Sequence, residues 1–170
     1  MLINLESAKN EPGKAFKAHF CEVPQCEEYP IEYELSAPVS VDANYTFKGG
    51  SVFVNGEFTA VLKVCCSRCL KDMEYCMQAD FDEEFALKES DDVSYTYAED
   101  MLYLDKLILD KIMFELPARF LCKPDCKGLC PQCGADLNIA PCGCNILKTD
   151  NKKMNPFSKL EGMFDNTEEV

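Results

Sequence analysis

The sequence predicts an α+β protein, in which an antiparallel β-meander or partial barrel carries one main helix and ends in a small cysteine-rich module. Apolar residues alternate with polar ones over residues 39–87, and apolar residues recur at helical spacing between 104 and 112. Six of the twelve cysteines fall within residues 122–144. A period of two is typical of half-buried strands, whereas spacings of three and four residues are typical of helices.

The predicted strands follow one another through residues 39–87. Lys48-Gly49-Gly50 interrupts the alternation, and Asn55-Gly56 has the composition of a two-residue hairpin turn. We therefore expect antiparallel strands with one apolar face. The apolar positions are Val39, Val41, Ala43, Tyr45, Phe47, Val52, Val54, Phe58, Ala60, Leu62, Val64, Met73, Tyr75, Met77, Ala79, Phe81, Phe85 and Leu87.

One helix is predicted near residues 105–116. Asp105 is placed to act as its N-cap, and Pro117 is expected to end it because proline cannot continue a helix. The acidic residues 88–100 predict a loop, and EEYPIEYEL suggests one short extended piece within residues 1–36. The apolar residues of the predicted helix are Leu104, Leu107, Ile108 and Ile112.

These elements predict three parts: a β-rich body over residues 1–117, a cysteine-rich module over 118–148 and a tail over 149–170. Because 47% of the 170 residues are hydrophobic, a core can form without disulfides. The N-terminus lacks a cationic start followed by an apolar run, and no segment is long enough to cross a membrane, so we expect a cytoplasmic protein. In a reducing cytoplasm, clustered cysteines are more often metal ligands or catalytic thiols than disulfides.

The charge is strongly acidic and unevenly distributed. The formal net charge of −13 argues against general, non-specific nucleic-acid binding. Residues 117–160 hold seven Lys or Arg and three Asp, a balance of +4, which leaves −17 on the rest of the chain. This is either ordinary surface charge or a basic end on an acidic body, and the sequence leaves both open.

The stretch CKPDCKGLCPQCGADLNIAPCGC, residues 122–144, predicts a structural zinc site. Cys130-Pro131-Gln132-Cys133-Gly134 has the form of a zinc knuckle, in which two thiolates face one metal and a glycine permits the turn after them. A closed site needs four ligands, and cysteine-only ligation favours a structural role over a catalytic one. The expected main set is Cys130, Cys133, Cys142 and Cys144, with Cys122 and Cys126 as the competing pair.

Other interpretations of this stretch stay open. All six cysteines can serve two metals through bridging thiolates, an iron–sulfur cluster also accepts cysteine-only ligands, and the thiols can simply be reduced and unliganded. Zinc would supply the order that this segment, rich in glycine and proline, lacks.

A second cysteine group, Cys65-Cys66-Ser67-Arg68-Cys69, lies where a predicted strand ends. Cys66 shares the apolar face of that strand, and Cys66-x2-Cys69 also resembles a knuckle, beside an arginine that can lower a thiol pKa. A redox pair would require a βαβ setting that is absent, and a metal site would require a second pair that does not lie nearby in the sequence. We therefore favour a tight turn with a buried thiol, and keep Arg68 as a candidate contact.

No catalytic constellation is present in the sequence. It contains no Gly-rich phosphate loop, nucleophile elbow or H-E-x-x-H motif, and His19 is the only histidine. We expect a protein that is not an enzyme.

Several motifs together resemble the YceD family, the large ribosomal RNA subunit accumulation proteins. They are CSRCL, LDKL before the helix, LP, LCKPDCKGLCPQCGADLN, the closing CGC and NPFSKL at residues 155–160. The resemblance implies a role in accumulation or processing of large-subunit (23S) ribosomal RNA, and hence ribosome biogenesis. It also implies that Cys66, Arg68 and Cys69 match a shared family turn, whereas the zinc module acts as a brace.

The charge distribution and the resemblance together suggest the partners. The acidic body is expected to bind a basic ribosomal protein, while Lys148, Lys152 and Lys153 contact phosphates of pre-ribosomal large-subunit RNA. Neither a small-molecule substrate nor a membrane is expected. The competing functions are a zinc-stabilised protein-interaction adaptor that does not act on RNA, and a thiol redox sensor.

Overall fold

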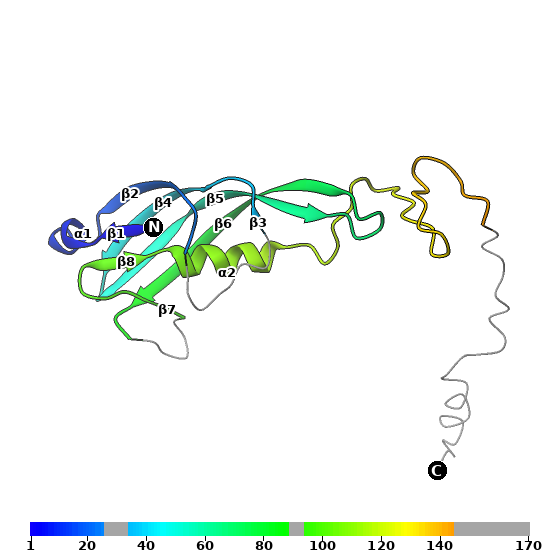
Figure 1. Ribbon diagram of the computed structural model, residues 1–170. Helices are drawn as coiled ribbons and strands as arrows, with labels where there is room; N and C mark the ends of the chain where they lie inside the picture. The colour runs from blue at the N-terminus through cyan, green and yellow to red at the C-terminus, as the bar shows by residue number, and fades with distance from the viewer. Residues whose placement is uncertain (26–33, 89–93, 145–170) are drawn as a thin grey trace, which may run out of the picture. The chain divides into compact units, whose positions relative to one another are not determined.

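A computed structural model of the chain describes residues 1–25, 34–88 and 94–144 (Figure 1). The chain forms two compact units, Met1–Cys126 and Lys127–Val170. The predicted body ended at residue 117, whereas the first unit continues to Cys126. The reason is that the segment after the helix is hydrogen-bonded to the turn that contains Ser67 and Arg68.

The first unit is built on a sheet of six strands among the described residues, in which β2, β4, β5, β6 and β7 are neighbours in that order and β3 pairs with β5. All neighbours are antiparallel except β6 and β7, which are parallel. The prediction of an antiparallel-rich α+β fold is therefore confirmed. The strands are β2 (Ala15–Glu22), β3 (Glu34–Leu35), β4 (Val39–Lys48), β5 (Ser51–Cys65), β6 (Asp72–Ala86) and β7 (Tyr95–Thr96).

Two further strands, β1 (Leu2–Asn4) and β8 (Met101–Tyr103), pair with each other in a separate antiparallel ribbon. The helices are α1 (Glu6–Asn10) and α2 (Asp105–Glu115). Neither described helix is long and apolar enough to span a membrane.

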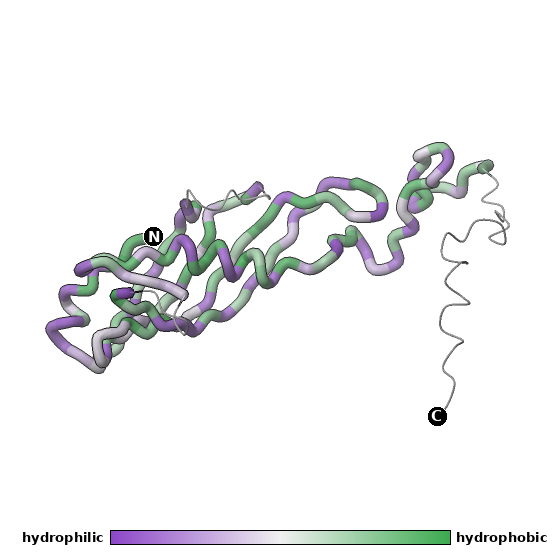
Figure 2. The backbone as a smooth tube through the Cα atoms, turned by 90° about the horizontal axis from the view of Figure 1, so that it is seen from below, coloured by the Kyte–Doolittle hydropathy of each residue, from purple (hydrophilic) through white to green (hydrophobic). Residues whose placement is uncertain are grey.

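The alternating pattern produces one buried face of the sheet. Along β4, β5 and β6, green and purple segments alternate in Figure 2, which reflects side chains that point to opposite faces. Helix α2 lies along the apolar face (Figure 1), and its own apolar residues join the same core. The largest fully buried side chains of these elements are Phe58, Phe85, Leu62, Leu104, Leu107 and Ile108.

The turn between β4 and β5 is formed by Gly49 and Gly50, with φ of +64° and +92°. Positive φ at both central residues is the requirement of a type I′ hairpin. The predicted turn at Asn55-Gly56 is wrong, because both residues lie inside β5 and pair with β4 and β6. A Cβ on Gly56 would lie 2.0 Å from the backbone oxygen of Asp42, so this glycine permits close approach of two strands.

Helix α2 is confirmed, as is its end before Pro117, but Asp105 is not the N-cap. Leu104 occupies that position and makes no side-chain cap bond. Asp105 is buried, with Oδ2 2.6 Å from the amino group of Met1 and Oδ1 accepting a bond of 2.9 Å from the backbone N–H of Gln25. A buried carboxylate requires such partners, and they use the oxygens that a cap would need.

The N-terminal region contains more structure than the sequence indicated. The predicted extended piece covers residues 27–35, of which only β3 falls within the described residues. Strand β2 was not predicted, although Phe16, Ala18 and Phe20 pack against the core from one face of it. Strand β7 likewise lies in the predicted loop of residues 88–100. Both strands were missed because their apolar stretches are short.

Candidate metal centres

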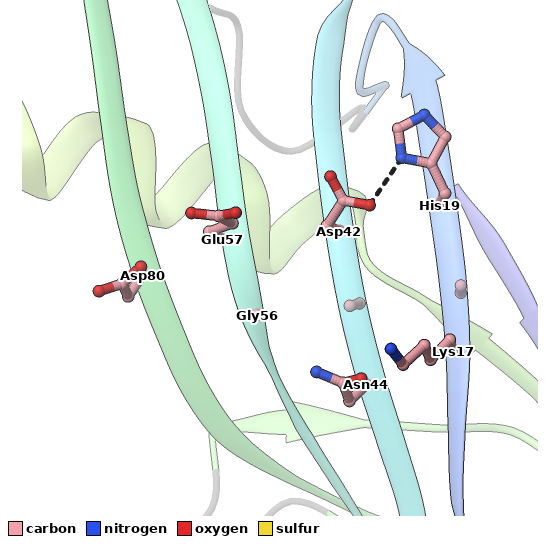
Figure 3. A pocket seen from close by; sticks show the side chains of 9 residues that line it. Lys17, His19, Asp42, Asn44, Gly56, Glu57 and Asp80 are labelled. Carbon is pink, nitrogen blue, oxygen red and sulfur yellow. Dashed lines mark hydrogen bonds and ion pairs between the residues drawn. The ribbon is translucent and has the colours of Figure 1, made fainter.

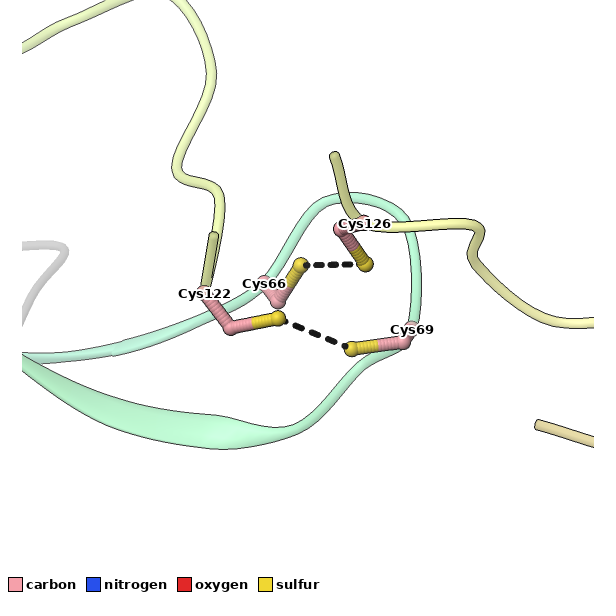
Figure 4. A group of neighbouring side chains, drawn as sticks. All are labelled: Cys66, Cys69, Cys122 and Cys126. Atoms are coloured by element: carbon pink, nitrogen blue, oxygen red, sulfur yellow. Dashed lines mark hydrogen bonds between the residues drawn. The ribbon is translucent and has the colours of Figure 1, made fainter. Parts of the chain in front are cut away.

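The structure gathers eight cysteines into two groups of four. In each group, the four Sγ atoms all lie within 4.8 Å of one another. The first cysteine cluster, shown in Figure 4, is Cys66, Cys69, Cys122 and Cys126, and all four belong to the first unit. The second cysteine cluster is Cys130, Cys133, Cys142 and Cys144, and all four belong to the second unit.

The first cysteine cluster joins two segments that are far apart in the sequence. Cys66 and Cys69 lie in the turn between β5 and β6, while Cys122 and Cys126 follow α2. Backbone bonds dock the two segments, since the N–H of Ser67 donates to the carbonyl of Phe120 at 2.7 Å. The N–H of Phe120 in turn donates to the Ser67 hydroxyl at 3.2 Å.

The sulfur positions of the first cysteine cluster fit a tetrahedral metal site. The Sγ atoms of Cys66 and Cys126 are 3.8 Å apart, and those of Cys69 and Cys122 are 3.6 Å apart (Figure 4). Zinc–sulfur bonds of about 2.3 Å give a tetrahedron with sulfur–sulfur edges of about 3.8 Å. The four sulfurs could therefore hold one metal ion with four ligands.

The turns Cys66–Lys71 and Cys130–Ala135 have the same backbone hydrogen bonds. In the first, the N–H of Leu70 donates to the Cys66 carbonyl and the N–H of Cys66 donates to the Lys71 carbonyl, both at 2.9 Å. In the second, the N–H of Gly134 donates to the Cys130 carbonyl and the N–H of Cys130 donates to the Ala135 carbonyl, both at 2.8 Å. The turn at Cys66 is therefore a second knuckle, equivalent to the one predicted at Cys130.

The residue after the second cysteine is left-handed in both knuckles. Leu70 has φ of +57° and Gly134 has φ of +73°. Glycine adopts this conformation at little cost, whereas a leucine is strained there. The sequence signal was therefore visible at Gly134 and hidden at Leu70.

Backbone donors make the first thiol of each knuckle unusually acidic. The N–H groups of Cys122 and Cys69 lower the pKa of Cys66 to about 6. The N–H groups of Cys133 and Gln132 lower the pKa of Cys130 to about 6. Because metals bind thiolates rather than thiols, these hydrogen bonds prepare one ligand in each cluster.

Other thiols in the two clusters keep their protons more firmly. Loss of solvation and the neighbouring Cys126 thiol raise the pKa of Cys122 to about 12. The Cys133 thiol, followed by loss of solvation, raises the pKa of Cys144 to about 12. Four crowded sulfurs resist becoming anionic together, and a divalent cation would remove that repulsion.

The second cysteine cluster is held by short-range bonds. The N–H of Leu137 donates to the Gly128 carbonyl at 2.9 Å, and the Asn138 side chain accepts a bond of 2.8 Å from the N–H of Lys127. Asn138 also donates to Asp136, through its backbone N–H at 2.8 Å and its side-chain amide at 2.7 Å. This cluster is therefore assembled within residues 127–144.

Comparison with known proteins assigns these motifs to a family. The family model described as large ribosomal RNA subunit accumulation protein YceD matches residues 54–164. The chain belongs to the YceD family. The matched region begins in β5 and contains both cysteine clusters, so the resemblance seen in the sequence is confirmed.

Relatives of the YceD-family chain come from bacteria and plants. An uncharacterized protein of Mycobacterium bovis is 30% identical over 118 residues, which are 65% of this chain and 57% of the relative. A chloroplastic large ribosomal RNA subunit accumulation protein YCED homolog 1 of Zea mays is 25% identical over 162 residues, covering 75% of this chain and 54% of the relative. The chain spans about half the length of these curated relatives. No solved structure matches it.

The structure gives the family turn Cys66–Cys69 a different role from the one that the sequence predicted. It was expected to be a turn without metal because no second pair lies nearby in the sequence, but Cys122 and Cys126 complete its group of four. These two cysteines therefore do not compete for the second cluster. The four cysteines expected as the main set, Cys130, Cys133, Cys142 and Cys144, are the ones that the structure brings together there.

Arg68 was expected to lower a thiol pKa or to contact a partner. Its backbone N–H contributes to the lowered pKa of Cys66, after those of Cys122 and Cys69. Its guanidinium instead donates from Nη1 to the carbonyl of Cys126 at 2.7 Å.

Other candidate residues of the YceD-family chain lie away from the clusters. Cys21, Cys65 and Cys76 are exposed, and the bond from Cys65 to Asp72 raises the pKa of the Cys65 thiol. None of the described cysteines is in a disulfide. The predicted RNA contacts Lys148, Lys152 and Lys153 lie outside the described residues.

The solvent face of the sheet carries a shallow hollow of about 570 Å³ (Figure 3). Its acidic residues Asp42, Glu57 and Asp80 stand opposite one another on β4, β5 and β6. His19 on β2 is bonded to Asp42, with Nδ1 2.9 Å from Oδ1. Like charges in register repel, so a cationic partner would stabilise this row of carboxylates, although Lys17 also lines the hollow.

Proposed function

We propose that this YceD-family protein is a non-enzymatic ribosome biogenesis factor that supports accumulation or processing of 23S ribosomal RNA. The observation that carries the proposal is the match of residues 54–164 to the family of large ribosomal RNA subunit accumulation proteins. The names of the plant relatives, large ribosomal RNA subunit accumulation protein YCED homolog 1, support it. A cytoplasmic location, which the sequence predicts, is compatible with such a role.

We further propose that both cysteine clusters bind structural zinc. Four sulfurs at tetrahedral spacing, two knuckles with matching hydrogen bonds and the absence of disulfides among the described cysteines support this assignment. At the first cysteine cluster zinc would fasten the segment after α2 to the β5–β6 turn. At the second cluster it would order the loops of residues 127–144.

Charge supports separate contacts for protein and RNA. The acidic row Asp42, Glu57 and Asp80 suits a basic ribosomal protein, while Lys148, Lys152 and Lys153 suit RNA phosphates. Within the described residues 117–144, three cations and two Asp give a balance of only +1, so the basic end depends on the tail. Replacing the three tail lysines by alanine should weaken association with pre-ribosomal particles and reduce its salt dependence.

Depletion of the protein in its own cell tests the central proposal. We expect 23S ribosomal RNA to fall relative to 16S RNA, and large subunits to fall relative to small subunits on a sucrose gradient. The wild-type gene should restore both ratios, whereas a Cys66→Ser, Cys130→Ser double variant should not. Normal ratios after depletion would overturn the ribosomal assignment.

Two competing functions have distinct outcomes. A protein-interaction adaptor would retain its partners in a pull-down after RNase treatment and leave the RNA ratio unchanged. A thiol redox sensor is favoured by one observation, the low pKa of Cys66 beside the Cys126 sulfur. It requires Cys66 or Cys69 to react with a thiol label in the metal-loaded protein, and we expect both to be protected.

A further inference from the structure

The side chain of Arg68 reaches from the β5–β6 turn to the segment that follows α2. Arg68 is exposed, and its Nη1 donates to the backbone carbonyl of Cys126 at 2.7 Å. The two residues are 58 positions apart in the sequence. The turn and the segment also meet at Ser67 and Phe120 and at the cluster sulfurs, whereas the Arg68 bond runs from a side chain to the main chain of a cluster cysteine.

The main chain of Cys126 is held differently from that of the knuckle cysteine Cys66. Cys66 both donates and accepts backbone bonds within its own turn. Cys126 lies in an irregular stretch, where its N–H donates to the Lys123 carbonyl at 3.1 Å. The carbonyl of Cys126 receives the Arg68 guanidinium, and a charged donor makes a stronger bond than a neutral one.

The position of the guanidinium also matters for charge. Four thiolates around one divalent cation leave a net negative charge, which is costly in a group whose members Cys66, Cys69 and Cys126 are buried. A cation bonded to the main chain of one ligand reduces that cost. Groups that orient and balance ligands from outside the coordination sphere commonly change metal affinity by about 10- to 100-fold.

We infer that Arg68 is a positioning residue for the first cysteine cluster. Its side chain holds Cys126 in place for the metal, and its positive charge offsets the negative charge of the thiolates. The inference rests on the proposed zinc sites, but not on the ribosomal role. Through this bond the exposed arginine of the family turn acts on the protein itself.

Metal binding by Arg68→Ala in the full chain tests this role. Cadmium-113 NMR should give one resonance for each cysteine cluster, which Cys130→Ser assigns by removing the signal of the second. We expect Arg68→Ala to shift and broaden only the first-cluster resonance. In a competition titration with a chelator, its first-cluster affinity should fall by about 10- to 100-fold.

Two further variants separate positioning from general damage. Gln132→Ala changes the equivalent position of the second knuckle, where no side-chain bond to a cysteine carbonyl is found among the described residues, and it should leave both affinities unchanged. Arg68→Lys keeps the positive charge and can still donate a hydrogen bond, so it should recover part of the metal affinity of the first cluster.

Two results would overturn the inference. If wild-type protein holds two metals and Arg68→Ala holds them with unchanged affinity, Arg68 does not position the cluster, while the zinc sites stand. If wild-type protein binds no metal, the zinc sites and the inference both fail. In either case the RNA ratios after depletion remain a separate measurement.

Discussion

The two cysteine clusters share one knuckle and differ in how it is completed. In the first cysteine cluster, the second pair of thiols comes from across the fold, with Cys66 and Cys126 separated by 60 positions. In the second, all four cysteines lie between residues 130 and 144. The first cluster therefore depends on the folded sheet and α2, whereas the second depends only on its own loops.

Burial follows the same division. In the first cluster Cys66, Cys69 and Cys126 are buried and Cys122 is exposed, whereas in the second only Cys130 is buried, Cys142 and Cys144 are half-buried and Cys133 is exposed. A ligand set that closes a long loop adds to the stability of the whole domain, because it restricts a large part of the unfolded chain. The first cluster should consequently behave as part of the body, and the second as an independent local module.

Removing one ligand from each cluster should give the largest change in stability, and the change should differ between the two clusters. Cys66→Ser should halve the zinc content and lower the free energy of unfolding of the first unit by about 4 kcal/mol or more, since it loses both metal and buried packing. Cys130→Ser should also halve the zinc content, but leave unfolding of the first unit unchanged. Elemental analysis and thermal unfolding followed by near-UV circular dichroism measure both quantities.

The exposed Cys76 provides the matched control. Cys76→Ser should keep both metals and change stability by no more than about 0.5 kcal/mol, as expected of an exposed residue outside any cluster. Equal destabilisation of the first unit by Cys66→Ser and Cys130→Ser would show that the clusters are not independent.

Chelation should separate the clusters by rate. Local opening of the second cluster exposes few buried groups, so we expect it to lose zinc about tenfold faster, which corresponds to an opening free energy lower by ~1.4 kcal/mol. Release can be followed with a colorimetric zinc indicator in the presence of excess chelator, and the freed thiols identified by alkylation and mass spectrometry. A single phase, or earlier alkylation of Cys69 than of Cys133, would contradict the assignment.

The sequence was sufficient for the second cluster and insufficient for the first. The stretch Cys130-Pro131-Gln132-Cys133-Gly134 predicts a knuckle, and the remaining ligands Cys142 and Cys144 follow after a short loop. The first cluster requires contact between the β5–β6 turn and the segment after α2, which no local pattern specifies. The available signal was that Cys66-x2-Cys69 and Cys122-x3-Cys126 each lacked two ligands, so that one half-site could complete the other.

The sheet shows the same limit. Side-chain parity along β4, β5 and β6 predicted the buried face, because alternation is a local property. The prediction is wrong for Leu87, which follows the end of β6 and is 60% exposed. Asn55-Gly56 was misassigned as a turn, because its role depends on the backbone of the neighbouring β4 at Asp42. Asp105 failed as a cap for a related reason, since its partners Met1 and Gln25 arrive through the tertiary fold.

Proton release should reveal what the clusters have in common. Each has one thiol with a pKa lowered to about 6, so at pH 7.5 Cys66 and Cys130 are already thiolates in the metal-free protein. The other ligands must lose protons on binding, and we expect about three protons released per zinc rather than four. Calorimetry in buffers of different ionisation enthalpy measures this number.

The sign of the pH effect on the metal-free protein follows from the same thiols. Their folded pKa lies below the unfolded value near 9.0, so their contribution to stability is present above that value and is lost as the pH falls through about 6. Release of four protons at each cluster, with no loss of metal-free stability between pH 9 and 6, would show that the backbone donors do not activate these thiols.

The smallest effect concerns the left-handed residue of each knuckle. Gly134→Ala should cost about 1 kcal/mol, seen as roughly fivefold weaker zinc binding at the second cluster, because alanine is strained at a φ of +73°. Leu70→Gly should relieve a similar strain at φ +57°, and the 66% exposed side chain gives up little packing. The greater freedom of glycine in the unfolded chain offsets part of this gain, so we expect the free energy of unfolding to rise by about 0.5 kcal/mol.

The opposite signs of these two substitutions make the comparison of the knuckles testable at a single backbone position. Both variants should retain two zinc ions, so any difference reflects conformation rather than ligation. Destabilisation of the first unit by Leu70→Gly would mean that the leucine side chain stabilises the turn through contacts stronger than the strain. In that case Leu70, and not only Arg68, would have to be counted among the residues that hold the first cysteine cluster together.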